Sequence, residues 1–245
     1  MRNVRFTLAA CFILAATCLT LPAQAQLVGY WPMEGDLNDA TAGSNNAVAK
    51  TGKPTFTDEV PAGIKSSKAL SLADNATVNI PHTDGLLDGK AFTISLWFNG
   101  QADSPGMWCR IISKMQRVEK TSVGIEIQRS AKTDELHYRV DTLKGFNQHG
   151  PIGKLLDGKW HHVVFTFDGT KLIDYVDGKK REHTIRAEKE LPMANTADLI
   201  LGQSGIEGRR FFTGLIDDVA VWKNVLTEQQ IKDLKDGKLT PTDIK

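Results

Sequence analysis

The chain has 245 residues, with 30 Lys and Arg against 29 Asp and Glu, so its formal net charge is +1. Charge this evenly balanced creates no strong field of one sign, and we therefore expect neither nucleic acid nor an anionic membrane as a partner. Hydrophobic residues make up 41% of the chain, and it contains three cysteines. These values favour one sizeable core over a disulfide-stapled scaffold.

The first 25 residues predict a signal peptide. Arg2 and Arg5 supply a positive start, residues 6–21 are apolar apart from small polar side chains, and residues 23–25 read Ala-Gln-Ala, an A-x-A cleavage site. A membrane anchor is the alternative, but the uncharged stretch is short for a span. We expect a secreted or periplasmic protein of 220 residues that begins at Gln26 and has no membrane span in the mature chain.

Cleavage would leave Cys109 as the one cysteine, because Cys11 and Cys18 lie in the signal peptide. No internal disulfide could then form. The apolar neighbours Trp108 and Ile111 predict a buried, inert thiol, since free cysteine packs as a small hydrophobe. A reactive or intermolecular thiol is the alternative.

Short apolar runs separated by Gly, Pro, Asn and Asp predict one all-β domain over residues 26–239. Residues 91–98 alternate clearly, with Phe92, Ile94 and Leu96 on one face and Thr93 and Ser95 on the other. The predicted strands are 27–33, 69–72, 77–80, 91–98, 110–114, 122–128, 136–141, 160–167, 171–176, 181–186, 198–202 and 211–223. We expect the tail, residues 240–245, to fray.

One helix is predicted near the end of the chain. Thr227 and Gln230 have the spacing of a capping box, Ile231 and Leu234 share a face, and Gly237 is placed to end the helix. We expect this helix to cover one end of the sandwich.

Five segments, taken in order, resemble a laminin-G-like jelly-roll domain of the concanavalin A-like lectin and glucanase superfamily. They are residues 30–34 (YWPME), 92–98 (FTISLWF), 157–163 (DGKWHHV), 175–178 (YVDG) and 212–219 (FTGLIDDV). The resemblance extends from about residue 27 to residue 234. It implies an all-β fold, a two-sheet antiparallel jelly-roll β-sandwich with one short C-terminal helix, and an exported recognition or structural module.

The resemblance also implies that the first and last strands pair, which would bring Glu34 close to Asp217 and Asp218. The oxygen-rich loop 36–46 resembles the family's D-x-S-G-N-x-N-x-G segment with stretched spacing, and calcium takes six to eight oxygen ligands. We therefore expect a structural Ca²⁺ held by Asp39, Asn45, Asn46 and Asp218, with Glu34 as a further ligand. Alternatively, the loop residues cap their own backbone and the two aspartates are solvated.

No catalytic residues are predicted, and we do not expect an enzyme. Glucanases of this fold carry carboxylates at alternate positions of one strand, but Glu126 is followed two residues later by Gln128. We interpret Glu126 as an outward polar residue. His161 and His162 should point to opposite faces of a strand and therefore should not chelate one ion.

The ligand is expected to be a glycan or an extracellular protein, bound at loops on one end of the scaffold or on the concave sheet. The candidate ligand-binding residues are Phe146, Asn147, Trp108 and Arg209, which combine aromatic faces with polar groups for hydroxyls. Trp108 could instead begin a strand and be buried. Two other readings remain open: a glycoside hydrolase of the same fold, and a structural or adhesive surface protein without a small ligand.

Overall fold

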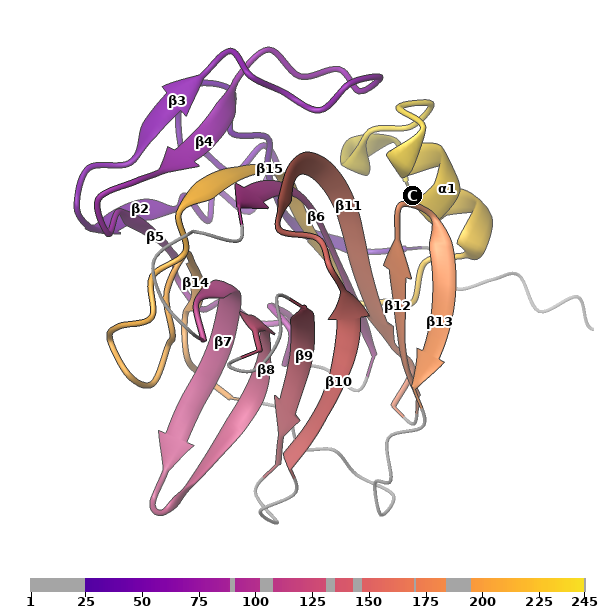
Figure 1. Cartoon of the computed structure of the whole chain (residues 1–245). Helices are drawn as coiled ribbons and strands as arrows, with labels where there is room; N and C mark the ends of the chain where they lie inside the picture. The colour runs from indigo at the N-terminus through magenta and orange to yellow at the C-terminus, as the bar shows by residue number, and fades with distance from the viewer. Residues whose placement is uncertain are drawn as a thin grey trace, which may run out of the picture.

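Two antiparallel sheets stack face to face in the structure, a computed structural model (Figure 1). The structure describes residues 25–88, 91–101, 108–130, 135–142, 147–169, 171–183 and 195–244. For residues 147–149 and 182–183 it describes the backbone and not the side chains. The predicted signal peptide, apart from Ala25, and Phe146 lie outside the described residues. The two-sheet antiparallel sandwich confirms the predicted fold class.

The first sheet has eight strands in the order β13-β12-β11-β6-β15-β4-β3, and β1 also pairs with β15. Its strands are β1 (Leu27–Trp31), β3 (Thr55–Thr57), β4 (Ala69–Leu72), β6 (Phe92–Gln101), β11 (Asp157–Phe167), β12 (Leu172–Val176), β13 (Lys179–His183) and β15 (Gly214–Trp222).

The second sheet has seven strands in the order β10-β9-β8-β7-β14-β5-β2. They are β2 (Val48–Thr51), β5 (Thr77–Ile80), β7 (Arg110–Val118), β8 (Thr121–Arg129), β9 (Leu136–Asp141), β10 (Asn147–Gly153) and β14 (Leu199–Leu201).

The alternating apolar residues of both sheets form the core between them. Phe92, Ile94 and Leu96 of β6 all lie in this core, together with Phe165 of β11 and Ile127 of β8. Because successive side chains of a strand point to opposite faces, the same alternation leaves a second set of side chains on each outer face.

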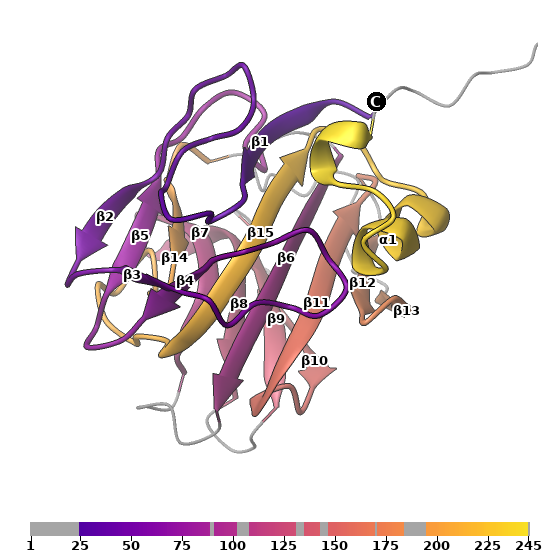
Figure 2. The same cartoon turned by 90° about the horizontal axis from the view of Figure 1, so that it is seen from above.

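The C-terminal segment covers the outer face of the eight-stranded sheet (Figure 2). Helix α1 (Glu228–Lys235) packs Ile231 and Leu234 against Tyr30, Val164 and Trp222. The capping box of Thr227 and Gln230 is present, as predicted. The loop between β3 and β4 crosses the same face over β15, β6 and β11. This outer face is therefore closed by two segments.

The predicted tail is wrong in one respect, since residues 240–244 do not fray. A 3-10 helix, η1 (Pro241–Asp243), follows α1, and the Ile244 side chain is 4% exposed in the apolar layer under α1. Burial of Ile244 gives these residues an anchor that the polar sequence does not suggest.

Most predicted strands are confirmed, and β4, β5 and β9 have the predicted bounds. Strands β2, β3 and β10 were not predicted, and β13 begins two residues earlier than expected. Asn147, which we expected in a loop, is the first residue of β10.

Candidate binding and metal sites

The first and last strands pair, as the resemblance implied. Tyr30 lies opposite Ala220, and Trp31 lies opposite Val219. A register shift in β15 falls between Asp217 and Ala220, so two consecutive residues, Asp217 and Asp218, separate the core side chains of Ile216 and Val219. Such a bulge inserts one extra residue into a strand, and it places two neighbouring carboxylates beside the first strand.

These carboxylates are close to Glu34 and carry strongly shifted pKa values. Burial, with the nearby charges of Asp218 and Glu34, raises the pKa of Asp217 to about 8. Burial also raises the pKa of Asp218 to about 6, with a contribution from Glu34, although a hydrogen bond from the Tyr30 hydroxyl at 2.5 Å opposes the shift. Ser66 Oγ donates to Asp217 at 2.8 Å, and the Ser67 hydroxyl and backbone N–H donate to Glu34. Three acidic side chains therefore meet where the chain's first and last strands pair, and burial disfavours the ionisation of Asp217 and Asp218.

The other predicted calcium ligands bind neighbouring backbone groups, and the Asn45 side chain donates to the Pro81 carbonyl at 3.0 Å. The Asp39 carboxylate accepts bonds from the backbone N–H groups of Tyr30, Thr41 and Asn45 at 3.1, 2.9 and 3.0 Å, and from the Thr41 hydroxyl at 2.9 Å. The side chain of Asn46 accepts from the Asp39 N–H at 2.9 Å. The structure thus brings Glu34 together with Asp218, and gathers Asp39, Asn45 and Asn46 in a separate group that caps the backbone.

A row of charged side chains crosses the outer face of the seven-stranded sheet. Glu126 on β8 lies opposite Ser113 on β7 and Arg139 on β9. Its carboxylate accepts from Arg110 at 3.0 Å, from Arg139 at 3.1 Å and from Ser113 at 3.1 Å. Arg139 also pairs with Asp141 at 2.5 Å. Glu126 faces away from the core, as predicted, and it is fully buried and paired with two guanidinium groups.

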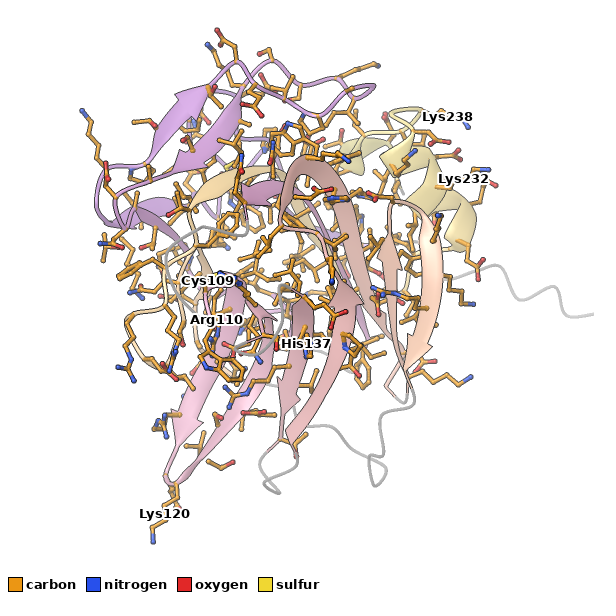
Figure 3. The ribbon with its side chains drawn as sticks, in the orientation of Figure 1. Cys109, Arg110, Lys120, His137, Lys232 and Lys238 are labelled. Carbon is orange, nitrogen blue, oxygen red and sulfur yellow. The ribbon has the colours of Figure 1, made fainter. Side chains whose placement is uncertain are left out.

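The candidate ligand-binding residues are divided between opposite ends of this sheet. Trp108 and Arg209 lie at one end, because the Arg110 N–H donates to the Arg210 carbonyl at 3.0 Å. Asn147 pairs with Asp141 at the other end. Figure 3 shows this separation along β7, with Arg110 at one end and Lys120 at the tip of the β7–β8 hairpin. Trp108 and Asn147 therefore do not line one site.

The end that holds Trp108 contains several buried polar atoms without a hydrogen-bond partner. They are Arg110 Nε, Gln203 Oε1 and Ser204 Oγ. Gln203 and Ser204 lie beside the start of β7. The Gly202 N–H donates to the Ile111 carbonyl at 2.9 Å, and the Ser204 N–H donates to the Arg209 carbonyl at 3.2 Å. Trp108 is half-buried, and Arg209 is exposed with a 3.3 Å contact to Glu207. Unpaired buried polar groups are uncommon and require an explanation such as a bound water or ligand.

Of the residues at this end of the sheet, only Trp108 and Arg209 were predicted from the sequence to bind a ligand. Arg110 was assigned to a strand, and Gln203 and Ser204 to the residues that follow one. Arg110, Gln128 and His137 are polar residues that lie opposite one another on β7, β8 and β9. The sequence shows each of them in a predicted strand, but only the strand register shows that they are neighbours.

The two adjacent histidines point to opposite environments, as predicted. His161 lies between Asp177 at 2.9 Å and Asp157 at 3.1 Å, and the bond to Asp177 is the main cause that raises its pKa. His162 is buried beside Ser95, with Nε2 2.8 Å from the hydroxyl, and burial lowers its pKa to about 3. They therefore do not share a metal ion.

Ser95 and His162 border a cavity of about 20 Å³ under the C-terminal segment, together with Trp97 and Asp218. That volume holds about one water molecule. A histidine whose pKa is about 3 is a weak base at neutral pH, so this pair is a poor nucleophile and base.

The described residues contain no helix of the length and hydropathy that crossing a membrane requires. Cys109 is free and buried, and burial raises the pKa of its thiol. The expectation of a buried, unpaired cysteine is confirmed.

Comparison with known proteins gives the same fold. Domain 4 of AbnA, a GH43 extracellular arabinanase from Geobacillus stearothermophilus in complex with arabinotriose, is similar with a TM-score of 0.66 and 19% identity, over 86% of this chain and 99% of that one. The binding domain of Paraclostridial Mosquitocidal Protein 1 is similar with a TM-score of 0.68 and 17% identity, over 87% of this chain and 52% of that one.

Among curated proteins, the adhesion G-protein coupled receptor V1 of Danio rerio is 26% identical over 148 residues, which are 58% of this chain and 2% of the receptor. The chain thus spans a small fraction of that relative. The family model described as the concanavalin A-like lectin/glucanases superfamily, Laminin_G_3, matches residues 72–232, more than half of the chain. The chain therefore belongs to the laminin-G-like family of the concanavalin A-like lectin and glucanase superfamily.

Proposed function

We propose that this protein is an exported, non-catalytic module that binds carbohydrate at the end of the seven-stranded sheet where Trp108 and Arg209 lie. The observation that carries the proposal is the group of unpaired polar atoms there, Arg110 Nε, Gln203 Oε1 and Ser204 Oγ. A sugar offers hydroxyls that both donate and accept, so it can satisfy a guanidinium donor and an amide acceptor together.

Two further features support a carbohydrate. The Trp108 carbonyl accepts from the Arg110 guanidinium, and the half-buried indole of Trp108 would offer a sugar ring an apolar face at this end of the sheet. A domain of the same fold, in the arabinanase named above, was solved with arabinotriose. An extracellular protein ligand is the second candidate, and export rests on the predicted signal peptide.

A hydrolase is disfavoured by the charge pairing on the same face. Glu126 and Asp141 are both held by Arg139, and Glu126 is also held by Arg110. A glycosidase requires a carboxyl group that can reach the glycosidic oxygen and give up a proton to the leaving group, whereas both of these carboxylates are buried within ion pairs.

The proposed module also includes a structural calcium ion between the first and last strands. Of the ligands expected from sequence, Glu34 and Asp218 remain suitable, and Asp217 joins them, because oxygen donors without a basic partner suit Ca²⁺. The oxygens of these three residues do not all lie within 4.8 Å of one another, so calcium binding would require Glu34 to leave Ser67. Asp39, Asn45 and Asn46 would then stabilise the adjoining loop.

The experiment measures binding of arabinotriose and of a broad glycan array to wild type, Trp108→Ala and Arg209→Ala. We expect each variant to bind at least roughly tenfold more weakly. Arg209→Ala would lose a charged hydrogen bond of about 1.5 kcal/mol, and Trp108→Ala would lose the apolar face of the indole. Arg117→Ala is the matched control, because Arg117 is an exposed arginine toward the other end of β7. Undiminished binding by both variants would refute this site. Asn147→Ala is measured alongside them, and a loss of binding in that variant alone would place the site at the opposite end of the seven-stranded sheet.

A further inference from the structure

His82, Asp84 and Asp88 converge in the loop between β5 and β6. One ligand atom from each of the three side chains lies within 4.8 Å of the other two. Within the residues that the structure describes, this is the one such group of three His, Cys, Asp or Glu side chains. The imidazole distinguishes it from a simple cluster of carboxylates, because a neutral ring nitrogen is a preferred ligand of transition metals.

The loop that carries the three side chains is anchored at both of its turns. The His82 N–H donates to Asp198 at 2.8 Å. The Leu86 N–H donates to the Thr83 carbonyl at 3.0 Å, and the side chains of Leu86 and Leu87 are buried in the core. The backbone is therefore fixed while the side chains at its surface, half-buried for His82 and Asp88 and exposed for Asp84, remain accessible.

We propose that His82, Asp84 and Asp88 form a binding site for a divalent transition-metal ion of the zinc type. A tetrahedral ion with bonds of 2.0–2.1 Å holds its ligand atoms about 3.4 Å apart, so small side-chain rotations close the observed group around an ion. Three protein ligands leave the fourth position to water or to a ligand group. Two carboxylates balance the charge of a divalent ion, and the imidazole selects zinc over calcium or magnesium.

The Lys114 ammonium lies beside this group of three side chains. Its Nζ lies 3.5 Å from His82 Nδ1, while its shorter contacts are to the carbonyl oxygen of Asn195 at 2.8 Å, the side-chain oxygen of Asn195 at 3.2 Å and the carbonyl oxygen of Ala197 at 2.8 Å. Because these oxygens hold the ammonium, it stays at the edge of the cluster and does not bridge the two carboxylates in any described contact. The two carboxylates can therefore be assigned two distinct roles, binding a metal ion and balancing the charge of Lys114, and an experiment can separate them.

The test is calorimetric titration of Zn²⁺ into the full chain, produced without a polyhistidine tag. We expect one saturable site in wild type and at least tenfold weaker binding in His82→Gln and in Asp84→Asn. Asp84 is exposed, so Asp84→Asn keeps the test decisive if His82→Gln is less stable. Anomalous diffraction at the zinc edge should place the ion on the three side chains.

His161→Gln is the matched control. His161 also stands between two aspartates, but they bind opposite ring nitrogens and cannot meet at one ion. We expect this variant to bind zinc as wild type does. The proposal is overturned if wild type takes up no zinc, which is the outcome if the carboxylates serve only to balance Lys114, or if His82→Gln and Asp84→Asn bind as tightly as wild type. Neither result depends on carbohydrate or calcium binding.

Discussion

Asp217 shows how one buried carboxylate can make a fold sensitive to pH. Its pKa of about 8 in the folded protein lies far above the value near 3.9 expected for the unfolded chain. The folded state therefore holds the proton more tightly, and this residue's contribution to the free energy of unfolding falls as the pH rises from about 4 to about 8. An amide at this position would imitate the protonated acid at every pH.

We therefore expect Asp217→Asn to melt at a higher temperature than wild type at pH 8 in the presence of a chelator. Each kcal/mol recovered should raise the melting temperature by about 2–4 °C, and the gain should disappear near pH 4. Melting followed by circular dichroism at several pH values measures the effect. Asp236→Asn is the control: hydrogen bonds from Lys235 and Lys238 lower the pKa of Asp236, so its amide variant should show no gain at pH 8. A constant difference between Asp217→Asn and wild type across this range would contradict the assignment.

Among the secondary-structure elements, β1 and β15 are the two that the proposed calcium ion would stabilise most, because their junction gathers Glu34, Asp217 and Asp218. A calcium ion there would bind the folded state and not the unfolded chain, since the three residues meet only after β1 pairs with β15. At a hundredfold excess over the dissociation constant, such a ligand stabilises by about 2.7 kcal/mol.

The corresponding prediction is that a calcium-selective chelator lowers the melting temperature by about 5–10 °C, and that added Ca²⁺ restores it. Asp218→Asn should remove the response to calcium, whereas His82→Gln should retain it, because His82 belongs to the proposed zinc site. Identical melting curves with and without chelator in wild type would exclude calcium from the junction.

The elements differ in how far their sequences reveal them. Strands of the core alternate strictly, and β4, β5 and β9 were predicted to the residue. Strand β2 is mostly exposed, so it lacks the apolar period by which strands are recognised. Strand β10 contains Gly150 and Pro151 and lies at the edge of its sheet, where proline is tolerated but predicts a loop when read alone.

The candidate sites were less predictable, because they depend on pairing between distant segments. The spacing of Ile216, Val219 and Val221 did carry the signal of a bulge, since the first pair is three positions apart and the second pair is two positions apart. Arg110 and Glu126 gave no comparable signal: nothing local indicates that they form an ion pair across strands. The three residues of the proposed zinc site lie within one loop, yet only the turns at Gly85 and Leu87 bring them together.

For the molecule as a whole, Cys109 should report the opening of the entire sandwich. Its side chain is inaccessible and lies in the core shared by both sheets, and a thiol with a raised pKa reacts slowly. We expect a thiol reagent to label Cys109 only after global unfolding, so that the labelled fraction and the loss of β-sheet circular dichroism share one denaturant midpoint. Subtraction of the signal from Cys109→Ala isolates this thiol, and labelling well below the midpoint would indicate local opening instead.

The pairing of β1 with β15 also sets the order of events during assembly. Tyr30 and Asp218 are 188 positions apart in the chain, so the eight-stranded sheet cannot be completed until nearly all of the polypeptide is present. The entropy of closing so large a loop is lost before the contacts form. Proteins dominated by such long-range strand pairing typically fold in milliseconds to seconds rather than microseconds. Throughout that interval, both edges of β15 would lack their final neighbours.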